Sequence, residues 1–161
     1  MKRTPIVILL GLLLVLTACV HRQGQTDTSE LTLYYRSTQQ HGPALVSQPY
    51  HGQATPNAMI QALLTGPEVD TLRSPYPSEL SLRGCKLNNG RLTVNFSEHY
   101  GGLAGIDLTL ADYCLVLTVC QLDEVDTVEI TVMGRPVPHR SHQLLTREEA
   151  LLILNHNLPS S

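Results

Sequence analysis

Large aromatic side chains are scarce in this chain of 161 residues, which has six Tyr, one Phe and no Trp. Hydrophobic residues nevertheless make up 42% of the sequence, and part of that share lies in one N-terminal run. A core therefore has to be built from Leu, Val and Ile, which are among the residues most often found fully buried. The length predicts one domain of ordinary size.

Basic residues are also few, since 11 Lys and Arg stand against 14 Asp and Glu and give a formal net charge of -3. The only basic cluster is Lys2-Arg3 at the N-terminus. This distribution argues against a nucleic-acid partner and against electrostatic docking on anionic lipid. A phosphate-binding loop is not expected either, because the glycine-rich stretch 101–105 lacks the Lys-Ser/Thr ending that such loops carry.

The apolar run from Ile6 to Leu16 is too short to span a membrane comfortably as a mature helix. A positive start, a short apolar stretch and small residues after it are typical of a signal peptide. The order Leu16-Thr17-Ala18-Cys19 resembles the lipobox of bacterial lipoproteins, in which the cysteine is acylated and becomes the first mature residue. An ordinary cleaved signal peptide and an uncleaved anchor are the alternatives, and all three place the domain across the membrane.

The lipobox resemblance implies three segments: a lipoprotein signal peptide over residues 1–18, a polar tether over 19–30 and a domain over 31–158. The tether, Val20 to Glu30, has no apolar stretch to bury. Membrane contact would come from acyl chains such as palmitate on Cys19, because stable attachment needs more than one lipid signal. The expected location is the extracytoplasmic face of the cell membrane.

Three further cysteines remain if Cys19 is acylated: Cys85, Cys114 and Cys120. If Cys114 and Cys120 share a helix, six residues separate them by about 9 Å of rise, beyond disulfide reach. A disulfide would then have to use Cys85. The alternative is three reduced cysteines that serve as small apolar residues in the core.

Alternation and turn signals predict the elements of the first half of the domain. Residues 31–36 alternate as a strand, and the loop 37–50 has room for one short strand. Thr55-Pro56 marks the start of a helix that ends at Gly66-Pro67. Asn89-Gly90 predicts a type I′ hairpin between 80–87 and 91–96, and the change of parity in its first arm predicts a bulge at 83–84.

The second half begins with residues 108–122, which are apolar on nearly every side and favour a central helix over a long strand. Residues 125–133 alternate as a strand, with Gly134 at its end. Thr146 and Glu149 form a capping box ahead of a C-terminal helix. Together the elements predict an α+β domain with one mixed sheet of about four or five strands and helices packed mainly on one face.

Several residue groups could carry chemistry, but each lacks a necessary part. His139-x-x-His142 has the spacing of two zinc ligands without a third nearby. Ser97, His99 and Asp112 could be combined into a triad, yet Ser97 has no G-x-S-x-G turn around it. We therefore predict no catalytic residues, no metal site and no cofactor.

An acidic turn and three tyrosines could each bind a ligand, but each also has a simple structural interpretation. The acidic turn that contains Asp123, Glu124 and Asp126 could hold calcium, although a solvated connection is the simpler interpretation, since its spacing is not that of an EF-hand. Tyr34, Tyr35 and Tyr113 could stack on a sugar or peptide, but they are also typical of half-buried sheet positions.

A resemblance to a known family rests on the order and spacing of several pieces. They are Leu31-Thr32-Leu33-Tyr34-Tyr35, Ala62-Leu63-Leu64-Thr65-Gly66-Pro67, Ser74-Pro75-Tyr76-Pro77, Asn89-Gly90, Leu92 to Ser97, and Leu117 through Gly134. Together they resemble the GerMN domain of sporulation and spore-germination lipoproteins over about residues 31–137. The three cysteines and the capped helix after residue 145 depart from that pattern, and a second copy of the domain is absent from this sequence.

The resemblance implies a non-enzymatic role in assembly or docking during sporulation or spore germination, since the family has no established catalytic centre. The partner would be a protein of the cell envelope or of the space between membranes. The alternative is a lipoprotein that binds an envelope glycan or peptide, which should show a concave pocket lined by Tyr and polar residues.

Overall fold

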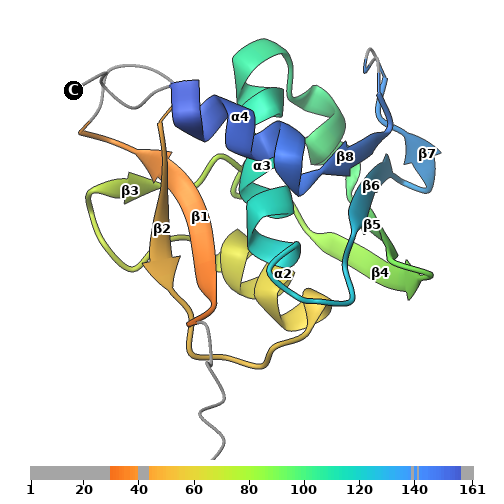
Figure 1. The fold of residues 1–161 in the computed structure, drawn as a ribbon. Coiled ribbons are helices and arrows are strands. Elements are labelled where there is room, and N and C mark those ends of the chain that lie inside the picture. The colour runs from red at the N-terminus through yellow and green to blue at the C-terminus, as the bar shows by residue number, and fades with distance from the viewer. Residues whose placement is uncertain (1–29, 40–43, 139, 141, 157–161) are drawn as a thin grey trace, which may run out of the picture.

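The computed structural model describes residues 30–39, 44–138, 140 and 142–156. Figure 1 shows the elements of this part of the chain. In chain order they are β1 (Thr32–Ser37), β2 (Leu45–Pro49), α2 (Pro56–Thr65), β3 (Leu72–Arg73), β4 (Leu82–Asn88), β5 (Arg91–Phe96), the 3-10 helix η1 (Glu98–Gly102), α3 (Gly105–Val119), β6 (Thr127–Val132), β7 (Arg135–Pro136), β8 (Leu144–Thr146) and α4 (Arg147–His156).

The α+β class predicted from the sequence is confirmed, but the strands form two sheets instead of one. The first sheet has three strands in the order β2-β1-β3, all antiparallel. The second has the order β4-β5-β6-β7, and β8 also pairs with β6. Alternation along a strand shows which face is buried but not which strands pair, so the division into two sheets was not visible in the sequence.

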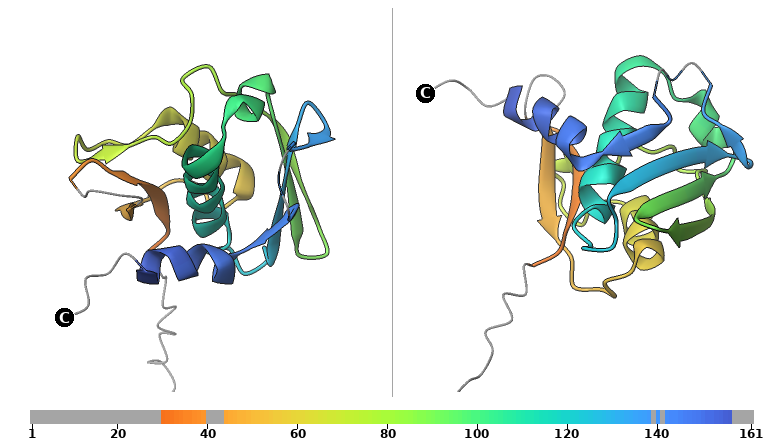
Figure 2. Two further views of the ribbon diagram at one scale, coloured as in Figure 1. Left: turned by 90° about the horizontal axis from the view of Figure 1, so that it is seen from above. Right: turned by 45° about the vertical axis from the view of Figure 1, so that its right-hand side comes forward.

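Helix α3 lies between the two sheets (Figure 2, left) and is therefore covered on nearly every side. Nine of its 15 residues are buried, including its only interior carboxylate, Asp112. The helices lie on the inner face of the second sheet, as predicted, but α3 is also the middle layer of the domain because the first sheet packs on its other side. A helix that is apolar all round belongs in the core of a protein, which explains the composition of this segment.

The connection from β5 through α3 to β6 makes these two strands parallel, with Leu92 opposite Val128 and Val94 opposite Ile130. Parallel neighbours need such a crossover, whereas β4 and β5 are joined by a tight antiparallel turn. Alternate residues of β5, Leu92, Val94 and Phe96, face the core and are fully buried.

The predicted hairpin and bulge are both confirmed. Asn89 and Gly90 have φ angles of 49° and 77°, the two positive values of a type I′ turn, and the register shifts between Leu82 and Gly84. Met133 and Gly134 repeat this pair of angles, at 51° and 77°, between β6 and β7. The sequence predicted only that a strand ends there, since Met is not typical of such a turn.

Both helix starts follow the local signals in the sequence. The Thr55 hydroxyl accepts a hydrogen bond from the Ala58 N–H at 3.4 Å before α2 begins at Pro56. At α4 the Glu149 carboxylate accepts from the Thr146 N–H at 3.0 Å, and the Thr146 hydroxyl accepts from the Glu149 N–H at 3.3 Å. This is the reciprocal pair of a capping box, as predicted.

Helix α3 begins and ends three residues earlier than predicted, and Gln121 supplies the reason for its end. The Gln121 side-chain amide donates to the carbonyls of Leu117 and Thr118 at 2.9 and 3.0 Å, where the last turn has no intrahelical donors. The same side chain exchanges hydrogen bonds with the backbone of Thr32, 89 residues away. Gln121 therefore joins the end of α3 to the start of β1.

Residues 1–29 lie outside the described part of the chain, and with them the predicted signal peptide, Cys19 and nearly all of the tether. Within the part that is described, no helix combines the length and apolar character needed to cross a membrane.

Candidate functional site

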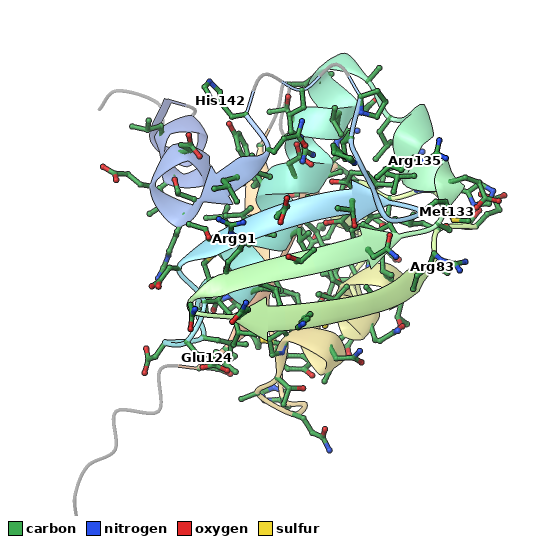
Figure 3. The ribbon with its side chains drawn as sticks, turned by 90° about the vertical axis from the view of Figure 1, so that its right-hand side faces the viewer. Arg83, Arg91, Glu124, Met133, Arg135 and His142 are labelled. Atoms are coloured by element: carbon green, nitrogen blue, oxygen red, sulfur yellow. The ribbon has the colours of Figure 1, made fainter. Side chains whose placement is uncertain are left out.

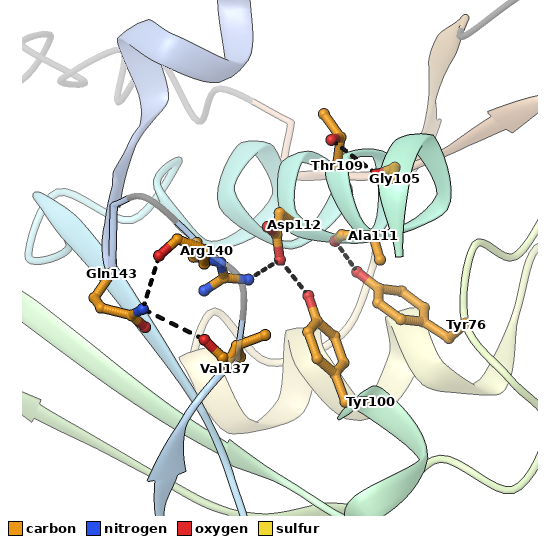
Figure 4. A network of polar contacts seen from close by, with 9 residues as sticks. All are labelled: Tyr76, Tyr100, Gly105, Thr109, Ala111, Asp112, Val137, Arg140 and Gln143. Atoms are coloured by element: carbon orange, nitrogen blue, oxygen red, sulfur yellow. Dashed lines mark hydrogen bonds and ion pairs between the residues drawn. The ribbon is translucent and has the colours of Figure 1, made fainter. Parts of the chain in front are cut away.

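A buried polar network joins α3 to the segment that follows β7 (Figure 4). Its centre is Asp112, whose side chain is only 8% exposed. The Tyr100 hydroxyl donates to one carboxylate oxygen of Asp112 at 2.5 Å, and the Arg140 guanidinium forms an ion pair with the same oxygen. Tyr100 comes from η1, so three separate segments meet at one carboxylate.

Aromatic side chains form one side of this network. The ring of Tyr100 stacks on that of Phe96, with centroids 4.8 Å apart, and Tyr76 lies 6.5 Å from it. The Tyr76 hydroxyl donates to the Ala111 carbonyl at 2.8 Å, so both buried phenols have hydrogen-bond partners. Burial raises the pKa of each phenol well above its ordinary value, and both remain protonated donors at neutral pH.

Opposing effects act on the carboxyl group of Asp112. Burial is the larger and raises its pKa, while Arg140 and the hydrogen bond from Tyr100 lower it. Loss of solvent disfavours the charged form of an acid, and a neighbouring cation favours it. The net direction is upward because the site is nearly dry.

Arg140 has hydrogen-bonding capacity beyond its ion pair. Its side chain is 6% exposed, and its Nε and Nη1 atoms have no hydrogen-bond partner among the described residues. The Gln143 side-chain amide donates weakly to the carbonyls of Arg140 and Val137, both at 3.4 Å, and its own Oε1 also lacks a partner there. Buried donors without acceptors are uncommon in folded proteins.

A pocket of about 330 Å³ lies against this network. Its polar wall is formed by Thr109, Asp112, Tyr113, Arg140, His142 and Glu149. Burial raises the pKa of Tyr113, and the nearby carboxylates of Glu149 and Asp112 raise it further. The pocket is therefore bounded by one face of α3, by the segment around Arg140 and by the first turn of α4.

The candidate triad is not assembled in this arrangement. Ser97 Oγ and His99 Nδ1 are 3.4 Å apart, but no hydrogen bond links His99 to Asp112 among the described residues. Asp112 is held by Tyr100 and Arg140 instead. The Ser97 hydroxyl accepts a hydrogen bond from the Ser81 N–H at 3.1 Å and fixes the chain beside the β4–β5 hairpin.

The candidate metal ligands are the two histidines of the His139-x-x-His142 motif and the acidic turn of residues 123–126. His139 lies outside the described residues, while His142 is exposed beside α4 (Figure 3). Asp123 and Glu124 are exposed, and Asp126 lies against the hairpin turn at Gly90. Over residues 30–39, 44–138, 140 and 142–156, no three His, Cys, Asp or Glu side chains lie close enough together to hold a metal ion.

The remaining predicted residues have mainly packing roles. Tyr35 is fully buried and donates to the Ala62 carbonyl at 3.3 Å, and Tyr34 is half-buried, so only Tyr113 lines the pocket beside Asp112. Cys85, Cys114 and Cys120 are all free thiols, which agrees with the reduced alternative. Burial raises the pKa of Cys120 to about 11, so this thiol stays protonated at neutral pH.

Sequence reasoning missed Tyr100 and Arg140 as partners of Asp112. The one available signal was a charged residue at position 112 in an otherwise apolar helix, because a buried carboxylate requires a partner. Neither the alternation of strands nor any motif identifies that partner, since Arg140 is 28 residues away in a connecting segment.

Comparison with known proteins places this fold among domains of sporulation proteins. The tandem GerMN domains of the sporulation protein GerM from Bacillus subtilis match at 18% identity with a TM-score of 0.61, over 74% of this chain and 46% of that one, so this chain spans about half that length. The first GerMN domain of the same protein matches at 17% identity with a TM-score of 0.61, over 74% of this chain and 98% of that one. A lipoprotein of Clostridium perfringens, described as putative, matches at 17% identity with a TM-score of 0.53, over 74% of this chain and 88% of that one.

At these identities the structural matches show the fold alone, and a comparison with curated proteins found no match. The sequence itself matches the family model "Germane: Sporulation and spore germination" over residues 32–138. That range begins at β1 and ends just after β7, so it leaves out Arg140, β8 and α4. The chain therefore belongs to the Germane family of sporulation and spore germination, as the GerMN resemblance of its sequence predicts.

Proposed function

We propose that this protein is a lipid-anchored lipoprotein of the extracytoplasmic membrane face that docks another envelope protein during sporulation or spore germination. The observation that carries the proposal is the Germane match over residues 32–138, preceded by the lipobox at Leu16-Thr17-Ala18-Cys19. Thr32, where β1 begins, follows the proposed acylation site by 13 residues, so the tether would hold the domain near the membrane.

A non-enzymatic role is supported by the bonding partners of the Asp112 carboxylate. Asp112, the only interior carboxylate of α3, is bonded to Tyr100 and Arg140 and forms no hydrogen bond with His99 among the described residues. His99 lies 3.4 Å from the Ser97 hydroxyl but has no carboxylate from Asp112 to orient it, as the third member of a catalytic triad would.

The outer face of the second sheet offers a surface for docking. No described element covers this face, on which Figure 3 labels Arg91 of β5. Alternation along the strands puts Thr93 and Asn95 of β5 on the same face, beside Thr131 of β6. One edge of the sheet is β4, whose bulge at Gly84 disfavours the addition of another strand, and the other edge is formed by the short strands β7 and β8. We therefore assign docking to the face of the sheet and not to its edge.

Complementation of a deletion strain tests the proposal, with heat-resistant spores and germination as the readouts. Thr93→Arg and Thr131→Arg, each on the outer face, should reduce complementation because they obstruct the docking surface. His99→Ala should complement fully, since it removes the base of the candidate triad and costs only the 3.4 Å contact to Ser97. Loss of complementation by His99→Ala, with normal folding and membrane attachment, would exclude the docking role in favour of a hydrolase.

A second candidate function is ligand binding in the envelope. The observation that favours it is the pocket of about 330 Å³ beside Tyr113 and Asp112. A concave site with an aromatic side chain and a few polar groups is the usual form of a small-molecule site.

A further inference from the structure

Four of the nine residues that line the pocket beside Asp112 lie outside the family match. Arg140, His142 and Glu149 all lie beyond residue 138, where the family match ends. They reach α3 because β8 pairs with β6 and places the start of α4 over the face of the helix that carries Asp112. The pocket thus lies between α3 and this chain's C-terminal extension, and one of its walls depends on that extension.

Arg140 supplies unused donors at this site. A guanidinium has five N–H groups and no acceptor, and here only the contact to Asp112 is made by described residues. Its Nε and Nη1 atoms are buried, and Arg140 is one of the residues that line the pocket, so a rotation of the side chain or a bridging water would bring them within reach of a ligand oxygen. A ligand that accepts hydrogen bonds would satisfy a group that is otherwise costly to bury.

The charges around the pocket select against an anionic ligand. The positive charge of Arg140 is already balanced by Asp112, and Glu149 adds a further carboxylate to the wall. A ligand carboxylate or phosphate would face two negative groups, the buried Asp112 and the exposed Glu149. A neutral ligand avoids this repulsion.

The remaining wall suits a ligand whose groups both donate and accept. Carboxylates at Asp112 and Glu149 accept, Arg140 donates, and the hydroxyls of Thr109 and Tyr113 can do either. The Thr109 hydroxyl donates to the Gly105 carbonyl at 3.1 Å, which leaves its oxygen free to accept. Sugar hydroxyls have this dual character, and the ring of Tyr113 offers an apolar surface beside them.

We propose that the pocket between α3 and the C-terminal extension binds one neutral sugar unit of a glycan, with Arg140, Asp112 and Tyr113 as its main contacts. The pocket volume of about 330 Å³ lies at the lower end of the usual range for small-molecule sites, about 300–1,000 Å³, which fits a single ring. This inference rests on the second candidate function and is independent of the docking role.

Backbone amide NMR of the full-length protein tests the proposal, with N-acetylglucosamine and glucose as probes and the amide of N-acetyl-alanyl-alanine as a peptide probe. At least one sugar should give saturable shift changes confined to residues 105–113 and 142–149. Arg140→Lys, which keeps the charge beside Asp112, and Tyr113→Phe should each weaken binding about fivefold, the loss expected for one hydrogen bond.

Matched control variants are Arg36→Lys, in an exposed ion pair with Asp107, and Tyr34→Phe, on the half-buried Tyr of β1. Neither residue lines the pocket, so both should bind the sugar as the unaltered protein does. The absence of saturable shifts with either sugar, binding of the peptide probe alone, or an affinity for the sugar in both pocket variants equal to that of the unaltered protein would overturn the proposal. None of these outcomes bears on spore formation, so failure here is distinguishable from failure of the docking role.

Discussion

At the scale of single residues, Asp112 is the most constrained side chain in the described part of the protein. It is the only acid there whose whole residue is buried, and its charge is compensated by an arginine that is almost equally buried. Removing one member of such a pair leaves the other as an unpaired charge in a dry site, which costs more than the pair contributes. Its surface counterpart is the Arg36–Asp107 pair at 2.9 Å, whose side chains are 35% and 57% exposed.

We predict that Asp112→Ala lowers the free energy of unfolding by about 3–5 kcal/mol, because Arg140 loses its counter-charge in the core. Asp107→Ala, the matched change in an exposed pair, should cost less than about 1 kcal/mol. Urea unfolding at neutral pH measures both. Similar costs for the two variants would show that Arg140 can reach solvent.

Gly90 is required by two independent features of the hairpin turn. Its φ of 77° is unfavourable for other residues, and an added Cβ would lie 2.0 Å from Oδ2 of Asp126. We predict that Gly90→Ala destabilises the domain by about 1 kcal/mol or more. Gly102→Ala is the control, since no atom lies within 4 Å of the added Cβ there. Thermal unfolding of the two variants should differ clearly, and equal melting temperatures would contradict the turn geometry.

At the scale of elements, the start of α4 depends on the capping box of Thr146 and Glu149. We predict that Thr146→Ala costs about 1 kcal/mol, because the Glu149 N–H loses its acceptor and the Glu149 carboxylate loses the threonine hydroxyl. Thr71→Ala is the matched control at an exposed position, where no side-chain hydrogen bond is made within the described residues. Hydrogen exchange should increase in the first turn of α4 only in the Thr146 variant. Unchanged exchange there would mean that packing alone holds the helix.

At the scale of the whole molecule, β8 and α4 complete the second sheet and cover α3, although the family match ends before them. Adjacent leucines in β8 allow this contribution to be measured. Leu145 is 8% exposed and Leu144 is 39% exposed. We predict that Leu145→Ala costs about 2 kcal/mol or more, as for other buried leucines, whereas Leu144→Ala stays within about 0.5 kcal/mol. Equal stability of the two variants by denaturant unfolding would show that the extension is not part of the core.

Membrane attachment also belongs to the whole molecule. We predict that Cys19→Ala yields unprocessed precursor that incorporates no radiolabelled palmitate, because the thiol is the acylated group. Cys85→Ala is the matched control and should be labelled and processed normally, since Cys85 lies in β4 of the folded domain. Retention of label by the Cys19 variant would contradict acylation at that residue.

The elements could be predicted from the sequence where local signals specify them. The turn at Asn89-Gly90, the cap at Thr55 and the capping box at Thr146 each depend on residues within a few positions of one another. The end of α3 was predicted three residues too late, because the residue that terminates it, Gln121, acts partly through Thr32 at the other end of the domain.

By itself the sequence determined the α+β class, the family, the hairpin with its bulge, and the apolar helix at the centre, because periodicity and turn chemistry are local properties. Only the tertiary structure decided that the strands divide into two sheets around α3, and that Arg140 and Tyr100 meet at Asp112. The physical reason is the same in both cases. Strand partners and buried charge partners are chosen by packing between segments far apart in the chain, and no short-range pattern records which segments will meet.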